Sequence, residues 1–119
     1  DIAPLQLDQA LGHLVKNARQ ATPQKQHIVV RTWSTDDEVM IQVRDEGVGI
    51  AKEHLRRVFE PFFTTRGVGK GIGLGLTAAY GIVRRAGGDI EAESDGPNRG
   101  STFTIKLPRA AVAPLANVA

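Results

Sequence analysis

The chain opens with apolar residues that recur every three or four positions between Leu5 and Ala21. This spacing predicts an amphipathic helix, and Thr22-Pro23 supplies a stop signal. At about 100° per residue, the polar side chains of His13, Asn17 and Gln20 fall together beside the apolar stripe. We expect this flank of the helix to border a pocket.

Two further runs follow, Ile28 to Ser34 and Glu38 to Arg44, and in the second run Val39, Ile41 and Val43 share a face. Both are rich in β-branched residues and predict an antiparallel hairpin. Strict alternation places Asp45 in phase with the apolar residues of the second run, on the covered side of the sheet. A carboxylate in that position requires a hydrogen-bonding partner.

The rest of the chain contains further segments with helix and strand patterns. We expect a short helix around Lys52 to Phe59, a long loop, a helix from Leu74 to Ala86 that ends at Gly87-Gly88, and two further strands, Asp89 to Ser94 and one beginning near Ser101. The predicted fold class is α/β (α+β), a two-layer sandwich with helices on one face of a single sheet. Residues 1–108 would form the domain, and residues 109–119 a tail or linker.

Composition narrows the possible functions. The chain has 119 residues, of which 41% are hydrophobic and 24% charged, as expected for one globular domain. Its net charge of +2 comes with only 5% aromatic residues, which argues against a nucleic-acid partner. It has no cysteine, which excludes disulfides and is compatible with a cytoplasmic location. No apolar stretch is long enough to span a bilayer, so any inner-membrane anchor of a parent protein would lie outside this segment.

The segment Asp45-Glu46-Gly47-Val48-Gly49 directly follows a predicted strand. A covered carboxylate suits an exocyclic amine such as that of adenine, and the two glycines would let a planar base approach the backbone. An ordinary turn at the end of a strand is the alternative interpretation.

Alternate glycines run from Gly69 to Gly75 and open the last predicted helix. Bare amides beside a helix N-terminus form a site for phosphates, and a flexible hinge is the alternative. The run matches neither a dinucleotide-binding motif nor a Walker loop. In the first helix, the amide oxygen of Asn17 would suit Mg²⁺, whereas a solvated or capping Asn is the plainer interpretation.

The order of these motifs resembles that of the catalytic domains of bacterial sensor histidine kinases. The matching segments are residues 14–18 (N box), 45–49 (G1 box), 58–65 (F box), 69–76 (G2 box) and 100–103 (last-strand signature). The resemblance implies the Bergerat ATP-binding fold, in which a mixed sheet backs about three helices and a lid, here at about residues 59–73, covers the nucleotide.

The resemblance also implies roles for individual residues. Asn17 would hold Mg²⁺ with the ATP phosphates, Asp45 would receive the adenine amino group, and Thr102 would support Asp45 and the base through water. His13 stands where many histidine kinases have a second Asn and is a weaker metal candidate, with a plain helix-surface residue as the alternative. The other expected ATP-binding residues are Gln20, Ala21, Gly47, Gly49, Ile50, Thr64, Thr65, Arg66, Gly69, Gly71, Gly73, Leu74, Gly75 and Leu76. Phe59, Phe62 and Phe63 would pack the lid or belong to the core.

The implied activity is that of a protein histidine kinase that binds Mg²⁺-ATP and transfers the γ-phosphate to a histidine in two-component signalling. None of His13, His27 and His54 is followed by the acidic residue of the family's acceptor motif. The acceptor is therefore expected on a dimerisation domain of the same parent protein, with a response regulator as the next recipient. A serine kinase of the anti-sigma type, an ATPase module and a nonenzymatic nucleotide-dependent interaction domain remain alternatives.

Overall fold

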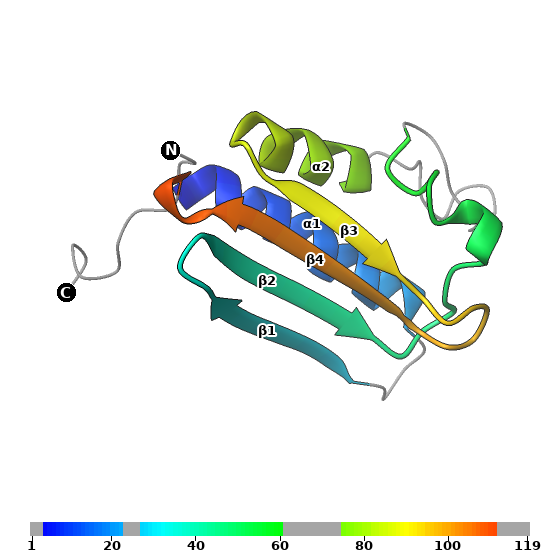
Figure 1. Ribbon diagram of the computed structural model, residues 1–119. Coiled ribbons are helices and arrows are strands. Elements are labelled where there is room, and N and C mark those ends of the chain that lie inside the picture. Colours follow the sequence, from blue (N-terminus) through cyan, green and yellow to red (C-terminus); the bar gives the residue numbers. More distant parts are fainter. Residues whose placement is uncertain (1–3, 23–26, 61–74, 112–119) are drawn as a thin grey trace.

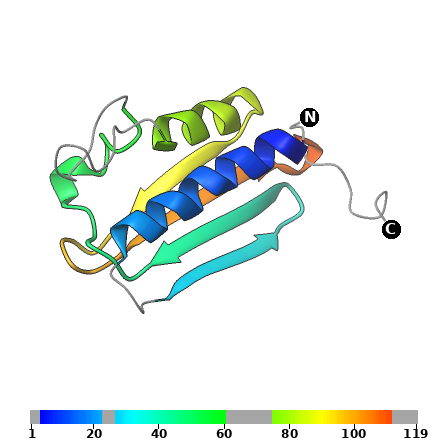
Figure 2. The ribbon, with the colours of Figure 1, turned by 180° about the vertical axis from the view of Figure 1, so that it is seen from behind.

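The computed structural model describes residues 4–22, 27–60 and 75–111, with no side-chain detail for residues 4, 5 and 111. Its elements form two layers, a sheet on one side and the helices α1 and α2 on the other (Figures 1 and 2). In chain order the elements are α1 (Pro4–Ala21), β1 (Ile28–Ser34), β2 (Glu38–Asp45), the 3₁₀ helix η1 (Lys52–His54), α2 (Gly75–Arg85), β3 (Asp89–Glu93), β4 (Ser101–Pro108) and the 3₁₀ helix η2 (Arg109–Ala111). The predicted two-layer α+β fold is confirmed.

The sheet has the strand order β1-β2-β4-β3, and every pairing is antiparallel. The expectation of a mixed sheet is therefore corrected, and the described residues contain two α-helices instead of about three. The stretch expected to be a short helix around Lys52 to Phe59 is a 3₁₀ helix followed by turns. Its backbone bonds join residues three apart, such as Arg57 N–H to the His54 carbonyl at 2.8 Å.

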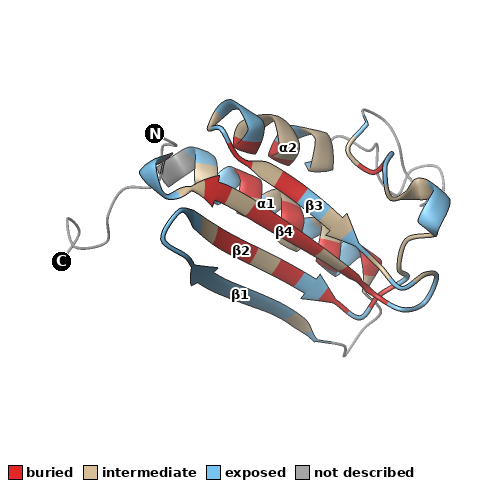
Figure 3. Cartoon of the chain, in the orientation of Figure 1, coloured by how far each residue is buried: buried red, intermediate tan, exposed pale blue. Residues whose placement is uncertain are grey.

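The core lies between the sheet and the two helices. The largest fully buried side chains are Leu14, Val43, Val83, Ile105 and Leu107, so each layer contributes to one continuous apolar cluster. Figure 3 shows this burial concentrated in β2, β4 and the facing sides of the helices, whereas the edge strand β1 is mostly exposed.

The turn after α2 returns the chain to the sheet. Gly88 N–H donates to the Val83 carbonyl at 2.9 Å, and Gly87 N–H to the Arg84 carbonyl at 3.0 Å. With Gly87 at φ 84°, these two bonds form a Schellman cap. The glycine pair therefore ends the helix as the sequence predicts, and β3 begins directly afterwards.

Candidate functional site

The candidate site lies where α1 and β2 end and the turn between β3 and β4 begins. The turn after β2 is held on both sides by backbone hydrogen bonds. Val48 N–H donates to the Ala21 carbonyl at 2.9 Å, and the Val48 carbonyl accepts from Asn98 N–H at 2.7 Å. Gly100 N–H adds a bond to the Gly47 carbonyl at 3.2 Å. The end of α1, the turn after β2 and the turn between β3 and β4 are thus held together by backbone hydrogen bonds.

Asp45 is the last residue of β2, and its side chain is buried, with 3% of its surface exposed. Its Oδ1 accepts a hydrogen bond from Gly47 N–H at 2.9 Å. Its Oδ2 is buried as well and has no hydrogen-bond partner among the described residues. Burial raises the pKa of the Asp45 carboxyl, and the hydrogen bond from Gly47 N–H, together with the polar backbone of Ser101 nearby, opposes that rise. The predicted orientation of Asp45 is confirmed, and its Oδ2 is an acceptor available to a ligand N–H.

Gly47 and Gly49 have reasons to be glycine within the protein itself. A methyl group on Gly47 would collide with the carbonyl oxygen of Ala21. Gly49 has φ 71°, and a methyl group there would collide with the carbonyl oxygen of Gly96. Close approach between backbones therefore explains both glycines, and access for a planar base stays an expectation.

Ser94, which the sequence did not single out, links the two turns of the site. Its Oγ accepts from Ile50 N–H at 3.0 Å and donates to the Gly100 carbonyl at 2.7 Å. A serine at the end of a strand carries no signal that would reveal this link, because Ile50 lies 44 residues away in the sequence. The turn it closes contains Gly96, Asn98 and Gly100, all at positive φ.

The register of the central strands brings Ser101, which was not among the expected site residues, opposite Asp45. Asp45 pairs with Ser101, whereas Thr102 pairs with Arg44. Since side chains alternate along a strand, Thr102 points to the face of the sheet opposite the helices. Ser101 is buried on the same side as Asp45, and support of Asp45 by Thr102 through water stays an expectation.

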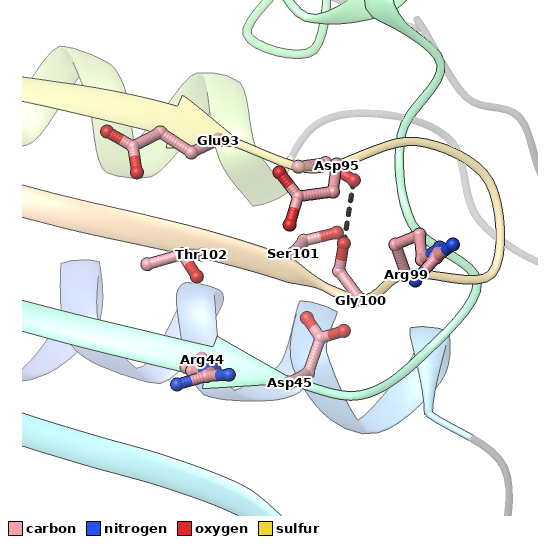
Figure 4. Close-up of a pocket in the computed structure, with 9 residues that line it drawn as sticks. Arg44, Asp45, Glu93, Asp95, Arg99, Gly100, Ser101 and Thr102 are labelled. Carbon is pink, nitrogen blue, oxygen red and sulfur yellow. Dashed lines mark hydrogen bonds between the residues drawn. The ribbon is translucent and has the colours of Figure 1, made fainter.

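A small polar pocket opens beside these residues at the end of the sheet (Figure 4). Figure 4 shows the Asp45 carboxylate pointing from the end of β2 towards Gly100. The pocket also includes Ser101 and Thr102 at the start of β4, so side chains from both faces of the sheet meet at its rim. The other lining residues are Glu93, Ser94, Asp95 and Arg99.

The other end of the candidate site is formed by α1 and the start of α2. His13 is half-buried, and a methyl group on Gly75 would lie 3.7 Å from its Nδ1 atom. His13 therefore lies beside the first residue of α2, and both interpretations of its role stay open. Asn17, also half-buried, lies one turn further along the same side of α1.

The described residues contain no group of three or more His, Asp or Glu side chains able to hold a metal ion. Any Mg²⁺ would thus depend on Asn17, phosphate oxygens and water. Of the remaining expected residues, Gln20 is exposed, Ala21 is buried, and Ile50 and Leu76 pack partly against the core. Outside the described residues lie Phe62, Phe63, Thr64, Thr65, Arg66, Gly69, Gly71, Gly73 and Leu74.

Phe59 belongs to the packed interior between η1 and α2. Its ring stacks on Tyr80, with centroids 5.0 Å apart, and meets Phe103 edge-on at 6.0 Å. The Thr77 hydroxyl donates to the Phe59 carbonyl at 2.8 Å. Of the two interpretations given for Phe59, the structure supports a core contact.

The family model "Histidine kinase-, DNA gyrase B-, and HSP90-like ATPase" matches residues 2–111. The Brucella abortus "Sensor kinase CckA" is 40% identical over 87% of this chain, and the Bacillus subtilis "Sporulation kinase E" is 39% identical over 88%. These matches cover 12% and 14% of the two relatives, respectively, so the chain spans a small part of their length.

Solved structures that share the fold include two that cover most of this chain. One, a "Mycobacterial sensor histidine kinase MprB", superposes with a TM-score of 0.78 and 28% identity, covering 87% of this chain and 70% of that one. The other is full-length ShkA in complex with AMPPNP, with a TM-score of 0.76 and 27% identity, covering 87% of this chain and 21% of that one.

The chain belongs to the histidine kinase-, DNA gyrase B- and HSP90-like ATPase family. Within that family, it is a catalytic ATP-binding domain of the kind found in two-component sensor histidine kinases. No helix in the described part of the chain is long and apolar enough to cross a membrane.

Proposed function

We propose that this domain binds ATP together with Mg²⁺ and supplies the γ-phosphate to a histidine on a separate domain of the same parent protein. The observation that carries the proposal is the buried Asp45 Oδ2, an acceptor without a partner among the described residues. Burying such an oxygen is costly unless a ligand satisfies it. An exocyclic adenine amine supplies the donor that this position lacks.

The adenine end of the site is prepared by groups that are already held in place. Gly47 N–H fixes one oxygen of Asp45, which leaves the other oriented for a base. The turn that follows is bonded to Ala21 and Asn98, so it does not need to be ordered when the nucleotide arrives. We propose that Asp45 recognises adenine through a hydrogen bond and that Gly47, Gly49 and Ile50 lie beside the base.

The phosphate end would lie along α1 towards α2. From Ala21 back to His13 the helix rises by about 12 Å, which separates the adenine end from the start of α2. Asn17 lies between them and offers an amide oxygen to Mg²⁺. When bound, the ion would neutralise charge on the phosphate oxygens. Gly75 and Leu76 open α2 and present backbone N–H groups suited to phosphate.

The remaining phosphate contacts are proposed for residues outside the described part of the chain, namely the glycine run Gly69 to Gly73 with Leu74, and Thr64, Thr65 and Arg66. Phosphoryl transfer requires mainly positioning and charge stabilisation. We propose that the domain supplies both and that the acceptor lies on another domain. A dimerisation domain carrying the acceptor histidine, and a response regulator after it, complete the proposal.

Calorimetric titration with ADP and ATP in the presence of Mg²⁺ tests the nucleotide site. Asp45→Asn presents an amide where a carboxylate accepted, so we expect affinity to fall more than tenfold, about 1.5–3 kcal/mol. Asp36→Asn, in the exposed β1–β2 turn, is the matched control and should bind normally. Equal affinity of the Asp45 variant and the wild type would contradict the proposal.

Transfer itself is tested with radiolabelled ATP and a dimerisation domain supplied as a separate polypeptide. We expect weak labelling of that domain, because the covalent tether is missing. The label should be acid-labile and base-stable, as expected for phosphohistidine. Acid-stable label on serine, or rapid phosphate release by this domain alone, would replace the histidine-kinase assignment with one of its alternatives.

A further inference from the structure

We infer that His13 sets which divalent cation accompanies the nucleotide, by adding an imidazole nitrogen to the oxygen ligand of Asn17 and favouring first-row transition ions over Mg²⁺. The inference rests on the proposed nucleotide function and concerns the same site. It begins from the position of His13, which is half-buried on α1 and faces Gly75 at the start of α2.

The imidazole of His13 is not used elsewhere in the described part of the chain. Neither of its ring nitrogens makes a hydrogen bond or an ion pair to another described residue. Other polar side chains around the site are engaged: Ser94 joins two turns, and Thr77 bonds to the Phe59 carbonyl. A half-buried imidazole whose nitrogens have no partner among the described residues therefore lies beside the expected phosphate end, where it can bind a ligand.

The spacing of His13 and Asn17 is that of a chelating pair on a helix. Residues four apart lie on one face, with Cβ atoms about 5–6 Å apart. Two side chains at this spacing can reach one ion, as the two histidines of a zinc-binding helix motif do. Here one member offers nitrogen and the other an amide oxygen, so the pair is of mixed character.

The mixture of a nitrogen and an oxygen ligand determines which cation binds more tightly. Mg²⁺ prefers oxygen ligands and keeps much of its water, so an imidazole adds little to its binding. Affinity of a nitrogen-containing site rises instead in the order Mn²⁺, Co²⁺, Ni²⁺. The positive end of the α2 dipole favours anions, so we expect the phosphates and their cation on this side of α1.

Calorimetric titration of ADP in the presence of each of Mg²⁺, Mn²⁺, Co²⁺ and Ni²⁺, at a pH where imidazoles are neutral, tests the inference. In the wild type, affinity relative to Mg²⁺ should increase from Mn²⁺ to Ni²⁺. In His13→Asn, which offers oxygen instead of nitrogen, the increase should shrink by about tenfold or more at Ni²⁺. His27→Asn removes an exposed histidine at the start of β1 and should leave the series unchanged.

A second readout reports the bond itself. Pulsed electron paramagnetic resonance of the Mn²⁺-ADP complex detects coupling to a directly bound imidazole nitrogen. We expect this coupling in the wild type and in His27→Asn and expect to lose it in His13→Asn. Circular dichroism and the melting temperature of each variant establish that it is folded.

The outcomes separate the two proposals. If the wild type binds ADP but shows the same metal series as His13→Asn, the role of His13 in metal choice is wrong while the nucleotide site stands. An equal loss of affinity with every metal in His13→Asn would show that His13 contacts phosphate instead, and would also overturn the inference. If the wild type binds no nucleotide with any of the four ions, the proposed function itself fails.

Discussion

The backbone of Gly47 packs directly against the carbonyl of Ala21, so that no side chain fits between them. The next amide along the chain, Val48 N–H, donates to that same carbonyl at 2.9 Å. The end of α1 and the turn after β2 are thereby joined as one unit. This contact therefore helps to fix Asp45 relative to Asn17, the two residues that we propose to contact opposite ends of the nucleotide.

Replacing Gly47 with Ala should therefore destabilise the domain, by about 1–3 kcal/mol, because backbone atoms must separate to admit a methyl group. Gly12→Ala is the matched control. Gly12 lies in the middle of α1 with open space around it, and Ala there should add about 0.5–1 kcal/mol by favouring the helix. Urea denaturation of both variants measures the difference. Equal stability of the two would contradict the close packing of Gly47.

Asp45→Asn should raise the thermal stability of the domain without nucleotide at neutral pH. Burial raises the pKa of Asp45 above its ordinary value of 3.8, so the folded state binds this proton more tightly than the unfolded state. Stability is then lost as the pH rises through the interval between the two pKa values, and the ionised group costs stability above it. The variant cannot ionise, and its amide oxygen can still accept from Gly47 N–H.

Melting temperatures of both proteins across the acidic to neutral range test this. The advantage of Asp45→Asn should be largest near neutrality and should shrink as the pH falls through the raised pKa of Asp45. Taking the difference between the two proteins cancels the titration of groups that they share. A variant that melts lower than the wild type at neutral pH would show that the carboxylate stabilises the fold, contrary to this account.

Local pattern was sufficient to predict some features of the site. The alternation within Glu38 to Arg44 correctly placed Asp45 on the covered side, because that phase is set by neighbours in the sequence. The helical stripe of the first element correctly put His13 and Asn17 on one side of α1. The end of α2 was equally local, since Gly87-Gly88 forms its own cap.

The features that the sequence did not predict depend on contacts between segments that are distant in the chain. The pairing of β2 with β4 brings Ser101 beside Asp45, and Ser101 was not among the expected site residues, because a register shifted by one residue reverses every side chain. The mixed sheet came from the family resemblance and not from the strands themselves. Gly47 and Gly49 must be glycine because the carbonyl groups of Ala21 and Gly96 lie against them. Both partners are distant in the sequence, so the neighbouring residues do not reveal these contacts.

Ser94→Ala tests whether the link between the two turns holds the adenine end together. The change removes the acceptor for Ile50 N–H and the donor to the Gly100 carbonyl, and we expect a loss of about 1–3 kcal/mol in stability. Amide hydrogen exchange measured residue by residue gives the specific readout: Ile50 N–H should exchange faster, while the amide of Val43 in β2 should keep the exchange rate expected from global unfolding. Ser34→Ala, at the exposed end of β1, is the control and should leave Ile50 unchanged. If Ile50 exchanged equally in Ser94→Ala and the wild type, the turn after β2 would be held by its bonds to Ala21 and Asn98 alone, and Ser94 would have no part in shaping the site.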